Sequence, residues 1–294
     1  SKMHLPCLSI PTTVAVRLSF RTMLSSITCT RLATLTSIFS STNLDKTMNP
    51  LLHKVSTTRF VCEPFHSDFM GQLTLNVLGN HLLNCAGEHA TERGFGMARL
   101  NEEDHTWVLS RMAIEFEELP KQYESFEIDT WVESVYRLFT DRNFAIRNQE
   151  GHTIGYARTV WAMIGVQSRK PIDLLSMHEG HLSDYVYPEK PCPIEKPGRI
   201  KVSAQMPSEH FTARYSDIDI NGHVNSIRYI EHVMNLFSLD YLREHPLRRF
   251  EIAYVTESYF GDTLDIYIDS KNNEHQVEIK KGNATICRCK LFFS

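Results

Sequence analysis

The sequence lacks the marks of several common protein classes. None of its apolar runs is long enough to cross a bilayer as a helix, so an integral membrane protein is not indicated. Acidic and basic residues number 35 and 31, a balance that does not favour nucleic acid as the main partner. The seven cysteines are odd in number and irregularly spaced, which favours reduced thiols over a disulfide framework or a zinc site.

Several catalytic motifs are also missing. There is no Gly-x-Ser-x-Gly elbow, which weakens an α/β-hydrolase interpretation. A Gly-rich phosphate loop and a His-Glu-x-x-His pair are absent too, so nucleotide and zinc-protease chemistry have no support. With 42% hydrophobic and 22% charged residues over 294 positions, the chain can form one large or two modest globular domains.

The N-terminal segment differs from the rest of the chain. Its first 44 residues contain no aspartate or glutamate, while Lys2, Arg17, Arg21 and Arg31 stand among many serines and threonines. This composition is typical of an organelle transit peptide. The alternative is a wrongly assigned start, with Met48 as the true first residue. In either case we expect residues 1–47 to be flexible and to carry no chemistry.

From Met48 onward the chain shows one pattern twice: a strand, a helix and then several strands. Leucines at three- and four-residue steps predict a helix over residues 73–90. A second helix is predicted over residues 225–242, with Ile230 and Phe237 in its core stripe. Strands are expected near residues 56–65, 107–119, 125–138, 143–148, 153–164, 210–216, 249–259, 263–269, 275–280 and 284–293.

The fold class expected from this pattern is α+β, with one helix against a long antiparallel sheet in each half. Four prolines within residues 187–197 predict an extended linker between the halves. The halves can be aligned through Ser67-Asp68-Phe69 and Ser216-Asp217-Ile218, an offset of 149 residues. The resulting domains are residues 48–184, a linker at 185–202 and residues 203–294. In this register the polar residues Asp219, Asn221 and His223 correspond to Met70, Gln72 and Thr74, as if the first half had lost its polar cluster.

The most informative segment is residues 215–229, which place several polar side chains between a strand and a helix. Unpaired N–H groups at a helix N-terminus can stabilise an oxyanion. Asn221 can orient water or donate to a substrate, and His223 can hold a neighbouring group or exchange a proton. A thioester is a suitable substrate for these polar groups, because a thiol has a pKa of about 8.5 and its thiolate is a good leaving group. The alternative is a turn with a helix cap, which we favour for Asp217 but not for Asp219, Asn221 and His223 together.

The pattern D-x-D-x-N-x-H-V-N at residues 217–225 resembles the acyl-acyl carrier protein thioesterase family, whose members are tandem double hotdog folds. A second match begins at Glu257, where the family places a catalytic glutamate. Plant members follow it with cysteine and this chain with Ser258, which puts a cysteine nucleophile in doubt. The first half matches at residues 158–163 and at Ser168-Arg169-Lys170. The resemblance covers about residues 57–293 and looks closer to bacterial members, such as those of Bacteroides-type anaerobes, than to plastid ones.

The resemblance implies a catalytic group made of Asp219, Asn221, His223 and Glu257. Glu257 would be the base, or the nucleophile, in attack on the thioester. Asn221 and nearby helix amides would bind the carbonyl, while His223 and Asp219 would position and tune the base. No cofactor and no metal is implied.

The same resemblance implies an activity and a partner. The enzyme would hydrolyse fatty acyl-acyl carrier protein and so end chain elongation. The acyl chain would occupy a tunnel in the first hotdog, walled by the helix around residues 77–85. A basic patch would receive the acidic carrier protein, with Lys196, Arg199 and Lys201, or Arg248 and Arg249, as candidates. A homodimer and a cytoplasmic location are further expectations, with the plastid stroma as the alternative if residues 1–47 are a real transit peptide.

Three alternatives remain open at this level, and one of them is not an enzyme. An acyl-CoA thioesterase shares the 219–224 pattern but is expected to assemble from separate single hotdog subunits. A non-catalytic acyl-binding module would have a degenerate site, and the intact polar set of the second half argues against it. A hotdog dehydratase is a third possibility whose acid and histidine arrangement has no place in this sequence.

Overall fold

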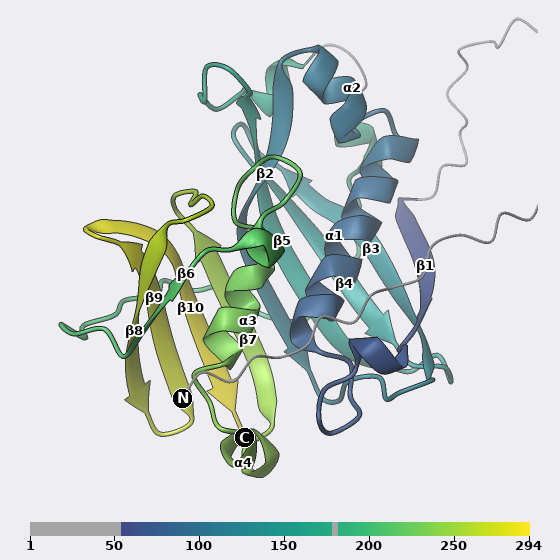
Figure 1. Cartoon of the computed structure of the whole chain (residues 1–294). Coiled ribbons are helices and arrows are strands. Elements are labelled where there is room, and N and C mark those ends of the chain that lie inside the picture. The colour runs from purple at the N-terminus through teal and green to yellow at the C-terminus, as the bar shows by residue number, and fades with distance from the viewer. Residues whose placement is uncertain (1–53, 178–181) are drawn as a thin grey trace, which may run out of the picture. The chain divides into compact units, whose positions relative to one another are not determined.

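The computed structural model describes residues 54–177 and 182–294, so the expectation for residues 1–47 lies outside the described chain. One antiparallel sheet of ten strands dominates the structure, and α1 and α3 lie across the same face of it (Figure 1). The strands are β1 (Val55–Val61), β2 (His105–Phe116), β3 (Ser125–Val135), β4 (Thr140–Arg147), β5 (Thr153–Gly165), β6 (Glu209–Thr212), β7 (Leu247–Tyr254), β8 (Thr263–Lys271), β9 (Glu274–Lys281) and β10 (Ala284–Phe293). The helices are α1 (Leu75–Glu92), α2 (Met97–Glu102), α3 (Arg228–Met234) and α4 (Leu239–Glu244), with short 3-10 turns η1 (Pro64–His66), η2 (Leu174–Ser176), η3 (Leu182–Tyr185) and η4 (Tyr215–Asp217).

The strand order makes the internal duplication visible. Across the sheet it runs β1-β3-β4-β5-β2-β7-β10-β9-β8-β6. Counted inward from each edge, the halves read β1-β3-β4-β5-β2 and β6-β8-β9-β10-β7, which is the same order in both. They join at the centre, where β2 pairs with β7 and Met112 lies opposite Ile252. The α+β class and the repeated strand–helix–strands pattern are therefore confirmed.

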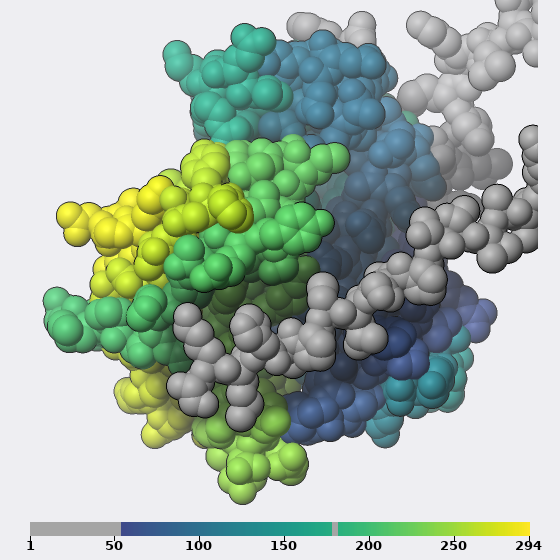
Figure 2. All heavy atoms as spheres, in the orientation of Figure 1, coloured from purple at the N-terminus to yellow at the C-terminus, as the bar shows by residue number. Residues whose placement is uncertain are grey.

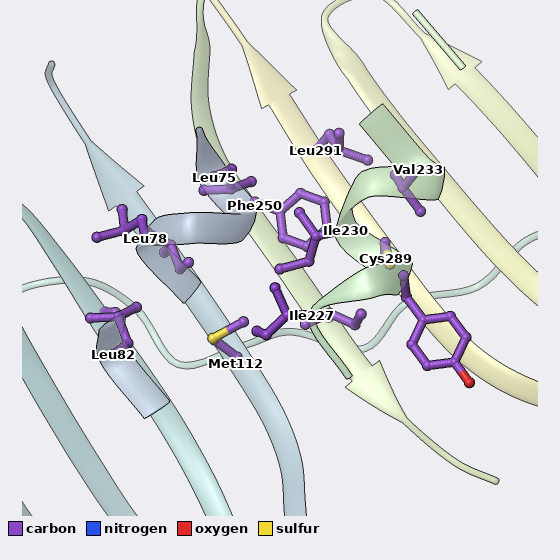
Figure 3. Packing of buried hydrophobic residues seen from close by; sticks show 14 of the residues in the cluster. Leu75, Leu78, Leu82, Met112, Ile227, Ile230, Val233, Phe250, Cys289 and Leu291 are labelled. Atoms are coloured by element: carbon purple, nitrogen blue, oxygen red, sulfur yellow. The ribbon is translucent and has the colours of Figure 1, made fainter. Parts of the chain in front are cut away.

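The core forms where the two helices meet the central strands. Leu78 and Leu82 of α1, and Ile230 of α3, are fully buried. Figure 3 shows these side chains gathered over Met112 of β2 and Phe250 of β7. Each such buried side chain contributes about 1.5–3 kcal/mol relative to an exposed one. Figure 2 shows the same helix-bearing face with all atoms, the green and yellow second half adjoining the blue first half.

A glycine permits the close approach of α1 and α3. A Cβ built on Gly79 would lie 2.8 Å from Cδ1 of Ile227 and 3.6 Å from Cδ1 of Ile230. Glycine in a helix interior costs about 1 kcal/mol relative to alanine. Here it allows the two helices to pack tightly enough to bury the central core.

The predicted helix over residues 225–242 is wrong in its extent. The structure has α3 up to Met234 and, after an interruption, α4 from Leu239. The Ser238 side chain accepts a hydrogen bond from the Tyr241 amide at 3.1 Å and so starts a new helix. Tyr241 then stacks on Phe237 and contacts His275, a packing that the turn makes possible. The 97–102 helix α2 was not predicted.

The proline-rich segment of residues 187–202 contains neither helix nor strand, and it packs onto the outer face of the first half. Cys192 and Ile194 are buried there against Trp131. The Trp131 indole donates to the Lys190 carbonyl at 2.7 Å, and the Arg158 guanidinium donates to the Ile194 carbonyl at 3.0 Å. The linker therefore covers the surface of the sheet that faces away from α1.

Candidate active site

The loop between η4 and α3 is organised by one carboxylate. Asp219 Oδ1 accepts hydrogen bonds from the amides of Asn221 at 2.8 Å and His223 at 3.2 Å. The Asp219 amide donates to the His223 carbonyl at 2.8 Å, and Gly222 takes a φ of +80°, which favours glycine. These bonds close a tight turn that leaves the side chains of Asn221 and His223 pointing outward from its backbone.

The first half contains the same turn, which corrects the predicted register. Asp68 Oδ1 accepts from the amides of Met70 at 2.8 Å and Gln72 at 3.0 Å, and Gly71 has a φ of +73°. Asp68 and Asp219 are 151 positions apart, so the offset of 149 is wrong. The two halves share the hydrogen-bonding geometry of this turn. The predicted alignment used the Ser-Asp dipeptides instead, and these do not occupy equivalent positions.

The corrected register pairs further residues of the two halves. His81 packs against Phe60 with ring centres 4.1 Å apart, and His232, 151 positions later, stacks on Phe211 at 3.6 Å. Asp219, Asn221 and His223 thus correspond to Asp68, Met70 and Gln72. The aspartate is kept in both halves, whereas the first half has Met70 in place of the asparagine and Gln72 in place of the histidine.

Glu257 reaches the loop from a neighbouring connection. It lies after the end of β7 at Tyr254, in the irregular segment that leads to β8, so its predicted position in a strand is wrong. Its Oε2 lies 3.6 Å from Nε2 of His223, and the Tyr259 hydroxyl donates to the same oxygen at 3.4 Å. The Tyr259 ring meets the His223 ring edge-on at 5.2 Å. The structure thus brings His223 and Glu257 together.

A residue of the first half completes this group. The Arg169 guanidinium forms an ion pair with Oε1 of Glu257, across 88 positions of sequence. Arg169 belongs to the Ser168-Arg169-Lys170 match, but no role for it was predicted from the sequence. Only the family resemblance could have drawn attention to Arg169, because no local residue spacing indicates a contact with the second half.

The prediction that helix amides near Asn221 bind the carbonyl cannot apply to residues 221–225, which precede α3. Besides the two amides bound to Asp219, the Gly222 amide donates to the Asp219 carbonyl, Val224 to the Ser258 carbonyl and Asn225 to the Asp217 carbonyl. These donors are engaged within the loop, and α3 begins only at Arg228. The Asn221 side chain is exposed on this loop.

Ser258 cannot act as an accessible nucleophile in this arrangement. It is completely buried, and its Oγ lies 2.7 Å from the hydroxyl of Tyr229. Burial raises the pKa of the Tyr229 hydroxyl, which therefore stays protonated. The serine where plant members carry cysteine is thus a packed hydrogen-bonding residue beneath the loop.

Asp217 has the structural role that was predicted. Its Oδ2 accepts from the Arg214 amide at 2.7 Å, and its Oδ1 lies 3.0 Å from Nε2 of His232 on α3. Asp217 is buried, and these bonds tie η4 to α3. Both carboxylate oxygens of Asp217 are thus engaged by residues other than His223 and Glu257.

Two of the predicted basic docking residues have structural partners. Arg249 is buried and pairs with Glu251 at 2.7 Å and Glu115 at 2.6 Å. Lys196 pairs with the buried Asp141 at 2.6 Å. Both side chains form ion pairs within the chain. Arg249, which is also buried, is therefore unsuited to bind an acidic carrier protein.

Metal and membrane features are absent from the part of the chain that the structure describes. Residues 54–177 and 182–294 contain no group of three histidine, cysteine or acidic side chains placed to hold a metal ion. Among the same residues no helix is long and apolar enough to cross a membrane. Their five cysteines are free thiols.

Comparison with solved structures identifies the fold as the double hotdog. An acyl-ACP thioesterase from Bacteroides thetaiotaomicron is 58% identical, with a TM-score of 0.78, over 82% of this chain and 98% of that one. A 12:0-ACP thioesterase from Umbellularia californica shares the fold at 18% identity and a TM-score of 0.72, over 83% of this chain and 98% of that one.

The family follows from the sequence. The acyl-ACP thioesterase N-terminal domain matches residues 53–177, and the acyl-ACP thioesterase C-terminal domain matches residues 200–286. The chain belongs to the acyl-ACP thioesterase family, and the predicted resemblance is confirmed.

Curated relatives are more distant. A chloroplastic palmitoyl-acyl carrier protein thioesterase of Gossypium hirsutum is 24% identical over 71% of this chain, and a chloroplastic oleoyl-acyl carrier protein thioesterase of Coriandrum sativum is 26% identical over 70% of it. The chain covers 54% and 60% of the lengths of these two proteins.

Proposed function

We propose that the chain hydrolyses fatty acyl thioesters of acyl carrier protein, releasing the fatty acid and so ending elongation. The observation that carries this proposal is the meeting of Glu257 and His223, 3.6 Å apart, beside the exposed Asn221. The 58% identity to the Bacteroides thetaiotaomicron acyl-ACP thioesterase supports the substrate class.

The chemistry follows from these three side chains. Glu257 takes a proton from water through Oε2, and the water oxygen attacks the thioester carbon. The Asn221 amide donates to the carbonyl oxygen as it becomes an oxyanion. When the intermediate collapses, the C–S bond breaks, and the proton held by Glu257 passes to the leaving thiolate. His223 orients the carboxylate and can relay that proton, while Asp219 holds the turn that presents Asn221 and His223.

The acyl chain is proposed to lie in the first half, between α1 and its strands. The inward residues of α1, including Leu78, Leu82 and Cys85, are apolar and buried. Such a surface suits a fatty chain, because burying each methylene group contributes about 0.8 kcal/mol. The second half would supply the reacting groups and the first half the acyl site.

The competing function is hydrolysis of acyl-coenzyme A. Both halves of the site lie in one chain, joined by the β2–β7 pair, which favours the family's carrier-protein enzymes over the single hotdog subunits of the rival. The test compares kcat/KM for one acyl chain attached to carrier protein and to coenzyme A. We expect at least a tenfold preference for the carrier protein. Equal or higher efficiency on coenzyme A would refute the carrier-protein assignment.

Location and assembly are part of the same proposal. We place the enzyme in a bacterial-type cytoplasm, supported by 58% identity to the Bacteroides protein against 24–26% to the chloroplastic ones. The plastid stroma is the alternative. The homodimer stays a prediction, which light scattering of the purified chain would test.

A further inference from the structure

The turn after β5 holds Arg169 in an unusual backbone conformation. The Gly165 amide donates to the Lys170 carbonyl at 3.0 Å, and the Arg169 amide donates to the Gly165 carbonyl at 2.9 Å. Within this turn Arg169 has a φ of +56°, in the left-handed region that side chains other than glycine seldom adopt. Such strain persists where surrounding contacts determine it, and it often accompanies a functional constraint.

The two oxygens of Glu257 face different partners. Oε1 is bound by the Arg169 guanidinium, which comes from the first half. Oε2 faces His223 at 3.6 Å and the Tyr259 hydroxyl at 3.4 Å, both from the second half. The ion pair therefore fixes the carboxylate so that only one oxygen is presented to the reacting group.

We propose that Arg169 is a positioning residue for the reaction, supplied to the active site by the non-catalytic half. It holds the Glu257 carboxylate in one orientation through Oε1, so that Oε2 is left towards His223 to act as the general base. This inference rests on the proposed function. It also gives the first half a part in catalysis beyond holding the acyl chain, because the second half alone contains no Arg169.

The other charged groups around Glu257 are few. His223 approaches from the loop before α3 and Tyr259 from the same connection as Glu257. Asp262, further along that connection, is turned away: it pairs with Lys281 at 2.7 Å and accepts from the Tyr259 amide at 2.9 Å. Within residues 54–177 and 182–294, Arg169 is thus the permanent positive charge that contacts the carboxylate.

The experiment measures kcat and KM on acyl-carrier protein for Arg169→Gln and Arg169→Lys. We expect Arg169→Gln to lower kcat tenfold or more with little change in KM, because the freed carboxylate no longer holds Oε2 towards His223. Arg169→Lys restores part of kcat. Lys170→Gln, which removes a neighbouring charge of the same turn, serves as the matched control and leaves kcat within about twofold of the wild type.

Two comparisons make the outcome decisive. In a Glu257→Gln background, Arg169→Gln should cause little further loss of kcat, since the two residues act as one unit. A rise in KM alone, with kcat unchanged, would show that Arg169 only attracts the substrate and would overturn the proposal. Wild-type protein without activity on acyl-carrier protein would refute the proposed function itself, whereas active wild type with an unaltered Arg169→Gln variant refutes only this inference.

Discussion

Asp68 and Asp219 make equivalent bonds in the two halves, yet only one of them borders reactive side chains. Each carboxylate accepts two backbone amides and closes a turn around a glycine with positive φ. The family resemblance implied a catalytic Asp219. Its geometry instead supports an indirect role, in which the carboxylate presents Asn221 and His223 to the substrate.

This role predicts a difference between matched variants. Asp219→Ala removes two hydrogen bonds of about 0.5–1.5 kcal/mol each and should lower kcat at least a hundredfold by releasing the turn. Asp68→Ala loses the same bonds in the first half and should cost similar stability but leave kcat within about threefold. Chemical denaturation and steady-state hydrolysis measure both effects. Similar loss of kcat in both variants would contradict the assignment.

At the residue scale, the sequence indicated which side chains to propose as reactive but not their arrangement. His223 and Glu257 could be named because the family pattern fixes them, and they do meet in the structure. The ion pair of Arg169 with Glu257 joins positions 88 apart. No local spacing encodes such a contact, so it required the folded chain.

Among the elements, strands were easier to predict than helix ends. Nearly all strands lie close to their predicted positions because alternating or continuous apolar patterns mark them. The apolar period of residues 225–242 continues through the interruption at Ser238, so the pattern alone indicated one helix. The available signal for a new helix was Ser238, a residue type that often caps helix N-termini. Its side chain accepts a hydrogen bond from the Tyr241 amide three positions later.

His81 and His89 of α1, the first half-buried and the second buried, give the fold a pH dependence. Burial and the neighbouring His66 lower the pKa of His81 to about 4, and burial with Arg142 and Arg93 lowers the pKa of His89 to about 3. The His81 Nε2 and His89 Nδ1 atoms also have no hydrogen-bond partner within the described chain, so the two residues are not fully satisfied. A charged imidazole is unfavourable at these two positions. The folded state therefore resists protonation of His81 and His89 more strongly than the unfolded chain does.

The sign of the effect follows from the lowered pKa values. Above pH 6.5 neither state binds these protons, and the stability is complete. As the pH falls from 6.5 towards 4, the unfolded state takes up protons that the folded state resists, and the free energy of unfolding drops by up to about 3 kcal/mol per histidine. His81→Leu should flatten this dependence in denaturant titrations at pH 7 and 4.5, whereas the exposed His152→Gln should not. An unchanged slope for His81→Leu would contradict the account.

The whole molecule is a duplicated unit whose copies have diverged. The mirrored strand order and the offset of 151 residues show the common plan. The sequence predicted the duplication correctly from its repeated pattern but mistook the register by two residues. Few residues are identical between the halves in either register, so sequence identity could not choose between the offsets of 149 and 151. The equivalent hydrogen bonds around Asp68 and Asp219 identify 151 as the correct offset.

The division of labour between the halves can be tested at equivalent core positions. Leu82 of α1 and Val233 of α3 are 151 positions apart and both fully buried. If the acyl chain lies in the first half, Leu82→Ala should shift the released fatty acids to longer chains by opening space there. Val233→Ala should leave the product profile unchanged, although both variants lose stability, about 2–5 kcal/mol for the leucine. Gas chromatography of fatty acids from a host expressing each variant measures the shift, and equal shifts would contradict the proposed acyl site.

The most direct test of the central claim is a single-turnover measurement of free thiol release from acyl-carrier protein by the wild type, Glu257→Ala and His223→Ala. Circular dichroism first confirms that each variant is folded, which the partly exposed positions of both side chains favour. We predict rapid release by the wild type and a loss of at least a hundredfold in each variant. Unaltered release in both folded variants would contradict the mechanism built on this pair.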